Sequence, residues 1–302
     1  MTQLRYRAHA KFNLALDVRG VRPDGYHEIR TVLQTMALCD LLDVYPAASG
    51  LEFTCSDPTL PAGEGNLVVK AALALREATG CAKGARIHLT KRIPSQAGLG
   101  GGSSDAAVAL MALARLWRLP SDPAALMPLA ARLGSDVPFF LVGGTALGVG
   151  RGEEIYPLPD APRLRLLVVK PASGMPTAEA YRRIDDRLTQ QEVTHNIYAI
   201  VQCAVDGRFD ERLLFNRFEE VATEKEGEAA ALRQALLDAG ARRAVLAGSG
   251  SSWVGLFQSR ALAQDAYRRM VHRGITVVLT ETLPRRDYWE RTLPRMEKET
   301  PS

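Results

Sequence analysis

The sequence predicts an α+β fold divided between two domains. Segments with the patterns of strands and of helices mix in both halves of the 302-residue chain. A proline-rich stretch at residues 157–162 separates the halves, and a new strand-like run follows it. The ordinary globular composition, with 46% hydrophobic and 24% charged residues, suits two domains of normal size. We therefore expect domains at residues 1–160 and 161–302.

The first strand is expected over residues 11–18, where apolar side chains alternate with others. In this pattern Lys11 and Asn13 point to the same face of the strand. A Pro-Asp-Gly turn signal then leads into a second run of strand-forming residues. The pattern predicts an early β-hairpin that carries Tyr26 and His27 at its tip.

The remaining elements are predicted by apolar periodicity and by capping, glycine or proline residues at their ends. Asn66 and Gly80, for example, bracket the first expected helix, and Trp117 ends an apolar stripe on the second. The expected helices are residues 67–78, 105–117, 121–134 and 260–273. The expected strands are residues 85–92, 164–169, 244–247, 253–257 and 275–280.

The charge balance favours a small anionic ligand over a nucleic-acid surface. The 38 Lys and Arg residues are nearly balanced by 34 Asp and Glu residues, and the basic residues rarely occur in runs. Cys39, Cys55, Cys81 and Cys203 are scattered without metal-ligand spacing, so neither a zinc site nor a disulfide framework is expected. No stretch approaches the roughly 20 apolar residues of a membrane span. A cytoplasmic, soluble protein is therefore expected.

The strongest local signal is a glycine-rich run between an expected strand and an expected helix. Residues 94–105 read PSQAGLGGGSSD, with four glycines in five positions. Such a backbone can approach a bulky anion, and the following helix start adds unpaired N–H groups and a positive dipole end. We expect a main-chain phosphate cradle, with Ser103, Ser104 and Asp105 capping the helix. A plain tight turn is the alternative, because the run is neither a P-loop nor a dinucleotide-binding fingerprint.

This run resembles the second signature of the GHMP kinases, named after galactokinase, homoserine kinase, mevalonate kinase and phosphomevalonate kinase. Residues 10–14 with 22–27, 133–140 and 248–250 extend the resemblance, which covers about residues 8–283. It implies an N-terminal ATP-binding domain like domain 2 of ribosomal protein S5 and a C-terminal ferredoxin-like α/β plait. The sequence departs from the family at His9, Gln96 and Ala247-Gly248. None of these departures removes a charged position, so they concern local loop shape.

The Asp-Gly-Tyr-His and Ser-Asp-Val-Pro segments narrow the resemblance to a kinase of a cytidine-diphosphate-linked polyol. It implies ATP-dependent phosphorylation of the 2-hydroxyl of CDP-methylerythritol, in the non-mevalonate (MEP) route to isoprenoids, with Mg²⁺ expected. By the same resemblance, Asp136 is the carboxylate at the acceptor hydroxyl and Lys11 the ammonium beside it. Without the resemblance, Asp136 reads as a cap and Lys11 as a solvated strand lysine.

The resemblance also implies binding residues. Tyr26 and Tyr181 would sandwich the cytosine, His27 would read its edge, and Asn13 and Thr177 would contact the rest of the substrate. Tyr181 could equally be an aromatic residue on a helix surface. Asn66 and Lys91 are weaker candidates for contacts near adenine. Without the resemblance, each would be interpreted as an ordinary loop or surface residue. The remaining residues expected to bind ATP are Pro94, Ser95, Gln96, Ala97, Gly98, Leu99, Gly100, Gly101, Gly102, Ser103 and Ser104.

Three other functions stay open at the level of sequence. The chain could be a GHMP kinase for mevalonate, homoserine or a sugar, or a nucleotide-binding regulator without turnover. RNA binding is the third, because the expected N-terminal architecture is like that of a ribosomal-protein domain. The partners expected are ATP and a small-molecule substrate, without nucleic acid or membrane, in a monomer or weak homodimer. No protein ligand to magnesium is indicated.

Overall fold

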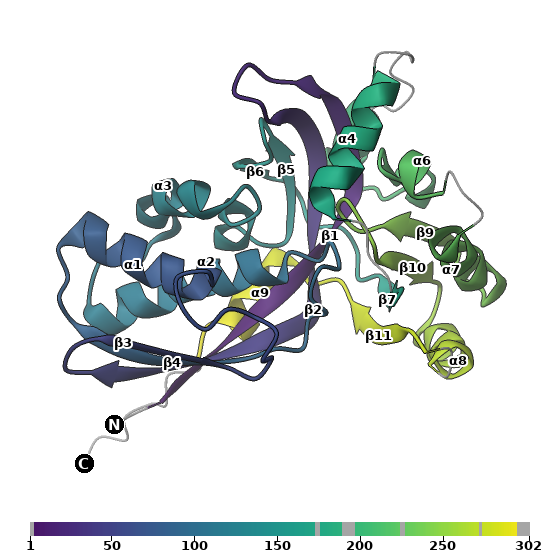
Figure 1. Ribbon diagram of the computed structural model, residues 1–302. Coiled ribbons are helices and arrows are strands. Elements are labelled where there is room, and N and C mark those ends of the chain that lie inside the picture. The colour runs from purple at the N-terminus through teal and green to yellow at the C-terminus, as the bar shows by residue number, and fades with distance from the viewer. Residues whose placement is uncertain (1–2, 173–175, 189–196, 224–226, 272–273, 295–302) are drawn as a thin grey trace.

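The computed structural model describes residues 3–172, 176–188, 197–223, 227–271 and 274–294. In this part of the chain, two β-sheets lie side by side, each with helices packed against it (Figure 1). The larger sheet belongs mainly to the first half of the sequence and the smaller sheet to the second half. The domain boundary near residue 160 stays a prediction.

The larger sheet is organised around one long antiparallel hairpin, β1 and β2. The hairpin and its turn agree with expectation, but β1 runs well beyond the expected residues 11–18, with irregular register near Lys11 and Asn13. The sheet order is β3-β4-β2-β1-β8, and β5 pairs with β2 and β6. Its strands are β1 (Leu4–Val21), β2 (His27–Ala47), β3 (Leu51–Cys55), β4 (Gly84–Thr90), β5 (Thr145–Val149), β6 (Glu154–Pro157) and β8 (Phe215–Asn216).

Helix α2 is the centre of the N-terminal core. It packs against β1, β2, α1, α3 and η1, and its residues from Ser104 to Ala114 are all buried. An apolar stripe alone was expected, but a helix enclosed between a sheet and other helices buries its whole circumference. The helices of this half are α1 (Leu67–Thr79), α2 (Gly101–Trp117), α3 (Pro123–Leu133) and the short 3₁₀ helix η1 (Pro138–Leu141).

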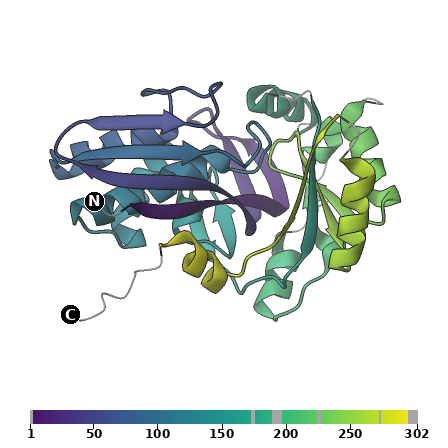
Figure 2. The same ribbon diagram turned by 90° about the horizontal axis from the view of Figure 1, so that it is seen from below.

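The smaller sheet is antiparallel with the order β11-β7-β10-β9, the βαββαβ arrangement of a ferredoxin-like plait. Helices α7 and α8 cover one face (Figure 2). Its strands are β7 (Arg165–Lys170), β9 (Arg243–Leu246), β10 (Trp253–Phe257) and β11 (Thr276–Glu281). The helices are α4 (Thr177–Leu188), α5 (Ile197–Val205), η2 (Glu211–Leu213), α6 (Glu219–Ala222), α7 (Glu228–Asp238) and α8 (Arg260–Met270). Of the expected helix 260–273, residues 272 and 273 lie outside the described residues.

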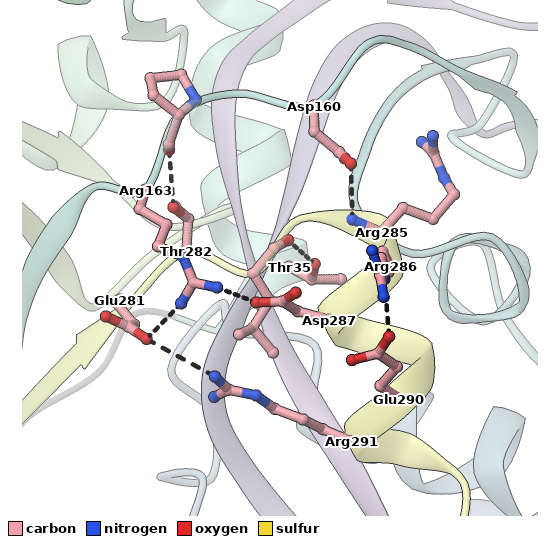
Figure 3. A network of polar contacts seen from close by, with 12 residues as sticks. Thr35, Asp160, Arg163, Glu281, Thr282, Arg285, Arg286, Asp287, Glu290 and Arg291 are labelled. Atoms are coloured by element: carbon pink, nitrogen blue, oxygen red, sulfur yellow. Dashed lines mark hydrogen bonds and ion pairs between the residues drawn. The ribbon is translucent and has the colours of Figure 1, made fainter.

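Helix α9 (Arg285–Thr292) leaves the smaller sheet and returns to the N-terminal half. The Tyr288 hydroxyl donates a 2.5 Å hydrogen bond to the carbonyl of Phe140, and the Trp289 indole donates to that of Val142. Within the second half, Arg163 contacts both Glu281 and Asp287 and so ties α9 to the smaller sheet (Figure 3). Helix α9 therefore joins the two halves beside η1.

Candidate active site

The glycine-rich loop, residues 94–104, lies between two cavities. A cavity of about 620 Å³ contains most of the loop together with Asn66, Lys91 and Asp105. A second cavity, of about 640 Å³, is lined by Lys11, Asn13, Tyr26, His27, Asp136, Thr177 and Tyr181 among others. Gly98, Gly100 and Ser103 line both. A phosphate chain bound on the loop from the first cavity would therefore reach the charged groups of the second.

The loop owes its shape to left-handed backbone. Gly98 has φ +73°, and a Cβ atom there would lie 1.9 Å from the carbonyl oxygen of Ala247. Only glycine permits this close approach of two loops. Gln96 also has positive φ, +53°, which is the conformation that glycine adopts most easily and is where the sequence departs from the family.

The expected capping by Ser103, Ser104 and Asp105 is wrong. Helix α2 starts at Gly101, with left-handed Gly100 as its N-cap and no side-chain capping bond. The turn at Gly100 starts the helix four residues before the expected residue 105, and the first N–H groups of the helix have no intrahelical acceptors. These groups are the donors that an anion uses at a helix N-terminus. Ser104 is fully buried and lines neither cavity.

Lys91 lies beneath the loop. It is therefore not the surface lysine that the sequence alone suggested. Its ammonium contacts Asp40 and lies 2.8 Å from Asp105 Oδ2. The Asp40 carboxylate also accepts from the backbone N–H of Ile93, at 2.8 Å. Burial raises the pKa of Asp105 to about 8, against the opposing charge of Lys91. Lys91 therefore joins β2, the chain after β4 and α2 under the phosphate loop.

Lys11 and Asp136 form an ion pair beside the glycine-rich loop, in the second cavity. Lys11 is 3% exposed, and its Nζ lies 3.3 Å from Asp136 Oδ2 and 3.1 Å from Asn13 Oδ1. The backbone N–H of Lys11 donates to the carbonyl of Leu99 at 2.9 Å, so β1 is tied to the loop. Asp136, between α3 and η1, keeps a side chain that is 38% exposed and lines the second cavity. The structure thus pairs a buried ammonium with an accessible carboxylate.

Asn216 supports the second glycine loop, residues 248–250, and was not identified from the sequence. Its amide donates to the carbonyls of Leu246 and Gly248, at 2.8 and 2.6 Å. The N–H of Gly248 in turn donates to Asn13 Oδ1, at 3.1 Å. Glu219 accepts from the N–H of Leu246, and burial raises the pKa of Glu219 to about 7. The only sequence signal was a polar residue inside an apolar run, which by itself indicates no partner.

The aromatic residues gather at the open end of the second cavity. Tyr26 is 54% exposed at the hairpin tip, and the Arg151 guanidinium lies 4.8 Å from its ring centroid. The Tyr181 ring packs 4.5 Å from that of His27, so Tyr181 is not a helix-surface aromatic. Burial and the charge of Asp136 raise the pKa of Tyr181 to about 12. Arg151 was not identified from the sequence, because its neighbours carry no recognisable motif.

Among the described residues, no three His, Cys, Asp or Glu side chains group as they would around a metal ion, and all four cysteines are free. Within the same residues, no helix has the length and apolar character to cross a membrane. A smaller cavity of about 320 Å³, between β2 and β11, is lined by Leu38, Arg165 and Glu281 among others and shares no residue with the site.

Comparison with known proteins gives consistent matches. The models for the GHMP kinases N terminal domain and the GHMP kinases C terminal match residues 66–144 and 207–275. A protein of Pelotomaculum thermopropionicum named 4-diphosphocytidyl-2-C-methyl-D-erythritol kinase is 43% identical over 278 residues, which are 91% of this chain and 96% of that protein. A Desulfitobacterium hafniense protein of the same name is 39% identical, over 94% and 97% of the two chains.

Solved structures match over similar lengths. A crystal structure of 4-(cytidine 5'-diphospho)-2C-methyl-D-erythritol kinase has a TM-score of 0.79 and 37% identity, over 92% of this chain and 98% of that one. Homoserine kinase from Cytophaga hutchinsonii has a TM-score of 0.70 with 20% identity, over 94% and 95% of the chains. The second match shows a shared fold alone.

Proposed function

The chain belongs to the GHMP kinases and, within them, to the 4-diphosphocytidyl-2-C-methyl-D-erythritol kinases, and from this membership we propose how its residues carry out the reaction. The protein is an ATP-dependent kinase that phosphorylates the 2-hydroxyl of CDP-methylerythritol in the MEP pathway. The expected GHMP kinase fold is confirmed, with its S5-like and ferredoxin-like halves.

The observation that carries the proposal is the 3.3 Å pair of Lys11 and Asp136 beside a loop that lines both cavities. ATP occupies the first cavity, with its phosphates against the backbone N–H groups of residues 98–103. The acceptor hydroxyl lies in the second cavity, in line with the γ-phosphorus. Such transfer needs positioning and charge stabilisation and no covalent step by the protein.

Lys11 and Asp136 have different roles in the transfer: Asp136 acts on the proton of the acceptor hydroxyl, and Lys11 on the negative charge of the transferring group. The acceptor oxygen forms a bond to the γ-phosphorus while the bond from that phosphorus to the β,γ-bridging oxygen breaks, and ADP leaves. Asp136 orients the hydroxyl and takes its proton. The Lys11 ammonium lies 3.3 Å from the Asp136 carboxylate and stabilises the charge on the transferring group. Burial of Lys11 strengthens this stabilisation, because the surrounding dielectric constant is lower.

Substrate recognition uses the open end of the second cavity. Tyr26 and Tyr181 hold the two faces of the cytosine ring, and His27 contacts its edge. Asn13 and Thr177 contact the diphosphate or the methylerythritol. Thr177 lies 3.0 Å from Ser249, so the second glycine loop shares this contact region.

Magnesium is the metal that this chemistry implies, and the residues present fit it. Ser103, which lines both cavities, would supply a hard oxygen donor of the kind that Mg²⁺ prefers. The remaining ligands would be ATP oxygens and water. When bound, the ion would neutralise charge on the phosphates of ATP.

The proposed setting is a monomer or weak homodimer in the cytoplasm, without a nucleic-acid partner. The four free cysteines suit a reducing compartment. Sedimentation velocity at micromolar concentration tests the oligomeric state. A filter-binding assay at physiological salt tests RNA, and sub-micromolar affinity would contradict this part of the proposal.

A coupled assay for ADP release tests the reaction. Purified protein is given ATP and Mg²⁺ with CDP-methylerythritol, mevalonate or homoserine in separate reactions. We expect ADP release and a phosphorylated product only with CDP-methylerythritol. Phosphorylation of mevalonate or homoserine in its place would refute the substrate assignment, and ATP binding without turnover would indicate a regulator.

A further inference from the structure

We propose that Asp185 determines the choice of base, by holding His27 in the tautomer that accepts a hydrogen bond from the 4-amino group of cytosine and rejects uracil. This inference rests on the proposed function, in which His27 contacts the edge of the base. Asp185 acts through His27 and is a positioning residue for specificity.

The central contact joins two residues that are 158 positions apart. Asp185 Oδ1 on α4 lies 2.7 Å from His27 Nε2, at the start of β2. The His27 side chain is 14% exposed and lines the second cavity. Within the described part of the chain, its other ring nitrogen, Nδ1, has no hydrogen-bond partner. One ring nitrogen is thus fixed by the protein and the other is left for a ligand.

Helix α4 fixes the ring as well as its proton. Tyr181 and Asp185 are four residues apart on this helix and so share one face. Tyr181 packs on the His27 ring with centroids 4.5 Å apart and an interplanar angle of 36°, while Asp185 holds its edge. Helix α4 stands beside the tip of the β1–β2 hairpin (Figure 1). Both the plane and the rotation of the imidazole are therefore set before a ligand binds.

The chemistry of the pair assigns the proton. A carboxylate can only accept hydrogen bonds, so Nε2 must carry the hydrogen that Asp185 receives. In the neutral ring, Nδ1 then holds a lone pair and can only accept.

Cytosine and uracil differ in the group that such an acceptor would meet. Cytosine carries an amino donor at C4, whereas uracil carries a carbonyl oxygen at the same position. Nδ1 would gain a hydrogen bond from cytosine but would face another acceptor in uracil. A site built to pair with a donor discriminates strongly against a ligand that leaves it unpaired.

The test compares CDP-methylerythritol with UDP-methylerythritol as substrates, by kcat/KM. In Asp185→Asn, the amide can donate to Nε2 and so admit the tautomer with hydrogen on Nδ1. We expect the wild-type protein to prefer the cytidine substrate strongly. The variant should lose about tenfold of that preference, roughly the contribution of one hydrogen bond. Asp185→Glu, which restores a carboxylate, should recover part of the preference.

Glu179→Gln is the matched control, because it removes a carboxylate from the same helix that pairs with Arg182 and Arg183 instead of His27. It should leave the preference unchanged. Equal losses with both substrates in Asp185→Asn, or an unchanged ratio, would overturn the inference. A wild-type protein that is inactive on CDP-methylerythritol would instead overturn the proposed function.

Nitrogen-15 chemical shifts of His27 give a readout independent of turnover. The wild-type protein should show a protonated Nε2 and an unprotonated Nδ1, and Asp185→Asn should show a mixture. Protonation on Nδ1 alone in the neutral wild-type ring would contradict the proposal even if the variants failed to fold.

Discussion

The two cavities beside the glycine-rich loop are built in different ways. The first cavity, in which we place ATP, is lined largely by the glycine-rich loop, and Lys91, the one cation among the described residues that line it, contacts Asp40 and Asp105. The second cavity, in which we place the acceptor, is lined by charged and aromatic side chains from separate elements, such as Lys11, Asp136 and Tyr181. Phosphate binding can therefore be achieved by a local segment, whereas phosphoryl transfer requires groups that only the fold brings together.

The largest effect is expected from the buried cluster of Lys91, Asp40 and Asp105 beneath the first cavity. Lys91→Met would leave the Asp40 and Asp105 carboxyl groups buried without their ammonium. We expect a loss of about 3–5 kcal/mol in the free energy of unfolding, measured by urea denaturation. Lys70→Met, on the exposed face of α1, is the control and should change stability by less than about 0.5 kcal/mol. A loss near zero for Lys91→Met would mean that the loop does not depend on this cluster.

Substitutions in the second cavity should lower kcat with little effect on the binding of ATP. We expect Asp136→Ala and Lys11→Ala each to lower kcat by about 10² or more while ATP binding persists, because each removes a contact of the transition state. Steady-state kinetics and calorimetric titration with ATP measure the two effects. Asp122→Ala, which removes only the exposed cap of α3, should keep normal kcat. Near-normal turnover in either site variant would refute the mechanism.

The contribution of Glu219, which supports the second glycine loop, to the stability of the protein should depend on pH. The pKa of Glu219 is about 7 in the folded protein, above its ordinary value of 4.5, because the carboxyl is buried. The folded state then binds the proton more tightly, so this contribution to stability is complete below about pH 4.5 and is lost as the pH rises towards 7.

Urea denaturation from about pH 5 to about pH 6.5 should show the wild-type protein losing about 2 kcal/mol relative to Glu219→Gln. Glu220→Gln, a neighbouring change of the same kind, serves as the comparison. Parallel pH profiles for the wild-type protein and Glu219→Gln would contradict the raised pKa.

The smallest effect is expected where the two glycine loops touch. Gly98→Ala would place a methyl group against the carbonyl of Ala247 and require left-handed backbone from alanine. We expect kcat/KM for ATP to fall about tenfold as the loop shifts. Gly63→Ala is the matched control, because a methyl group there meets no atom within 4 Å. Equal kinetics for the two variants would show that the contact at Gly98 is not needed.

The sequence by itself determined the features that depend on neighbouring residues. The β-hairpin followed from alternation and a turn signal, and α1 followed from its Asn66 cap and left-handed Gly80. The glycine-rich loop and its place before a helix followed in the same way. Even here the start of α2 was misplaced, because capping preference favoured the serines and the left-handed turn at Gly100 started the helix earlier.

Only the tertiary structure decided which distant polar groups meet. It pairs Lys11 with Asp136, joins Asp185 to His27, and buries Lys91 between two carboxylates. It also brings Asn216 to the loop at Gly248. A polar side chain in a sequence carries no signal of its partner, because the partner is chosen by the packing of whole elements. Turns and helix ends can be predicted since their partners are a few residues away, whereas these contacts depend on how the two sheets are joined.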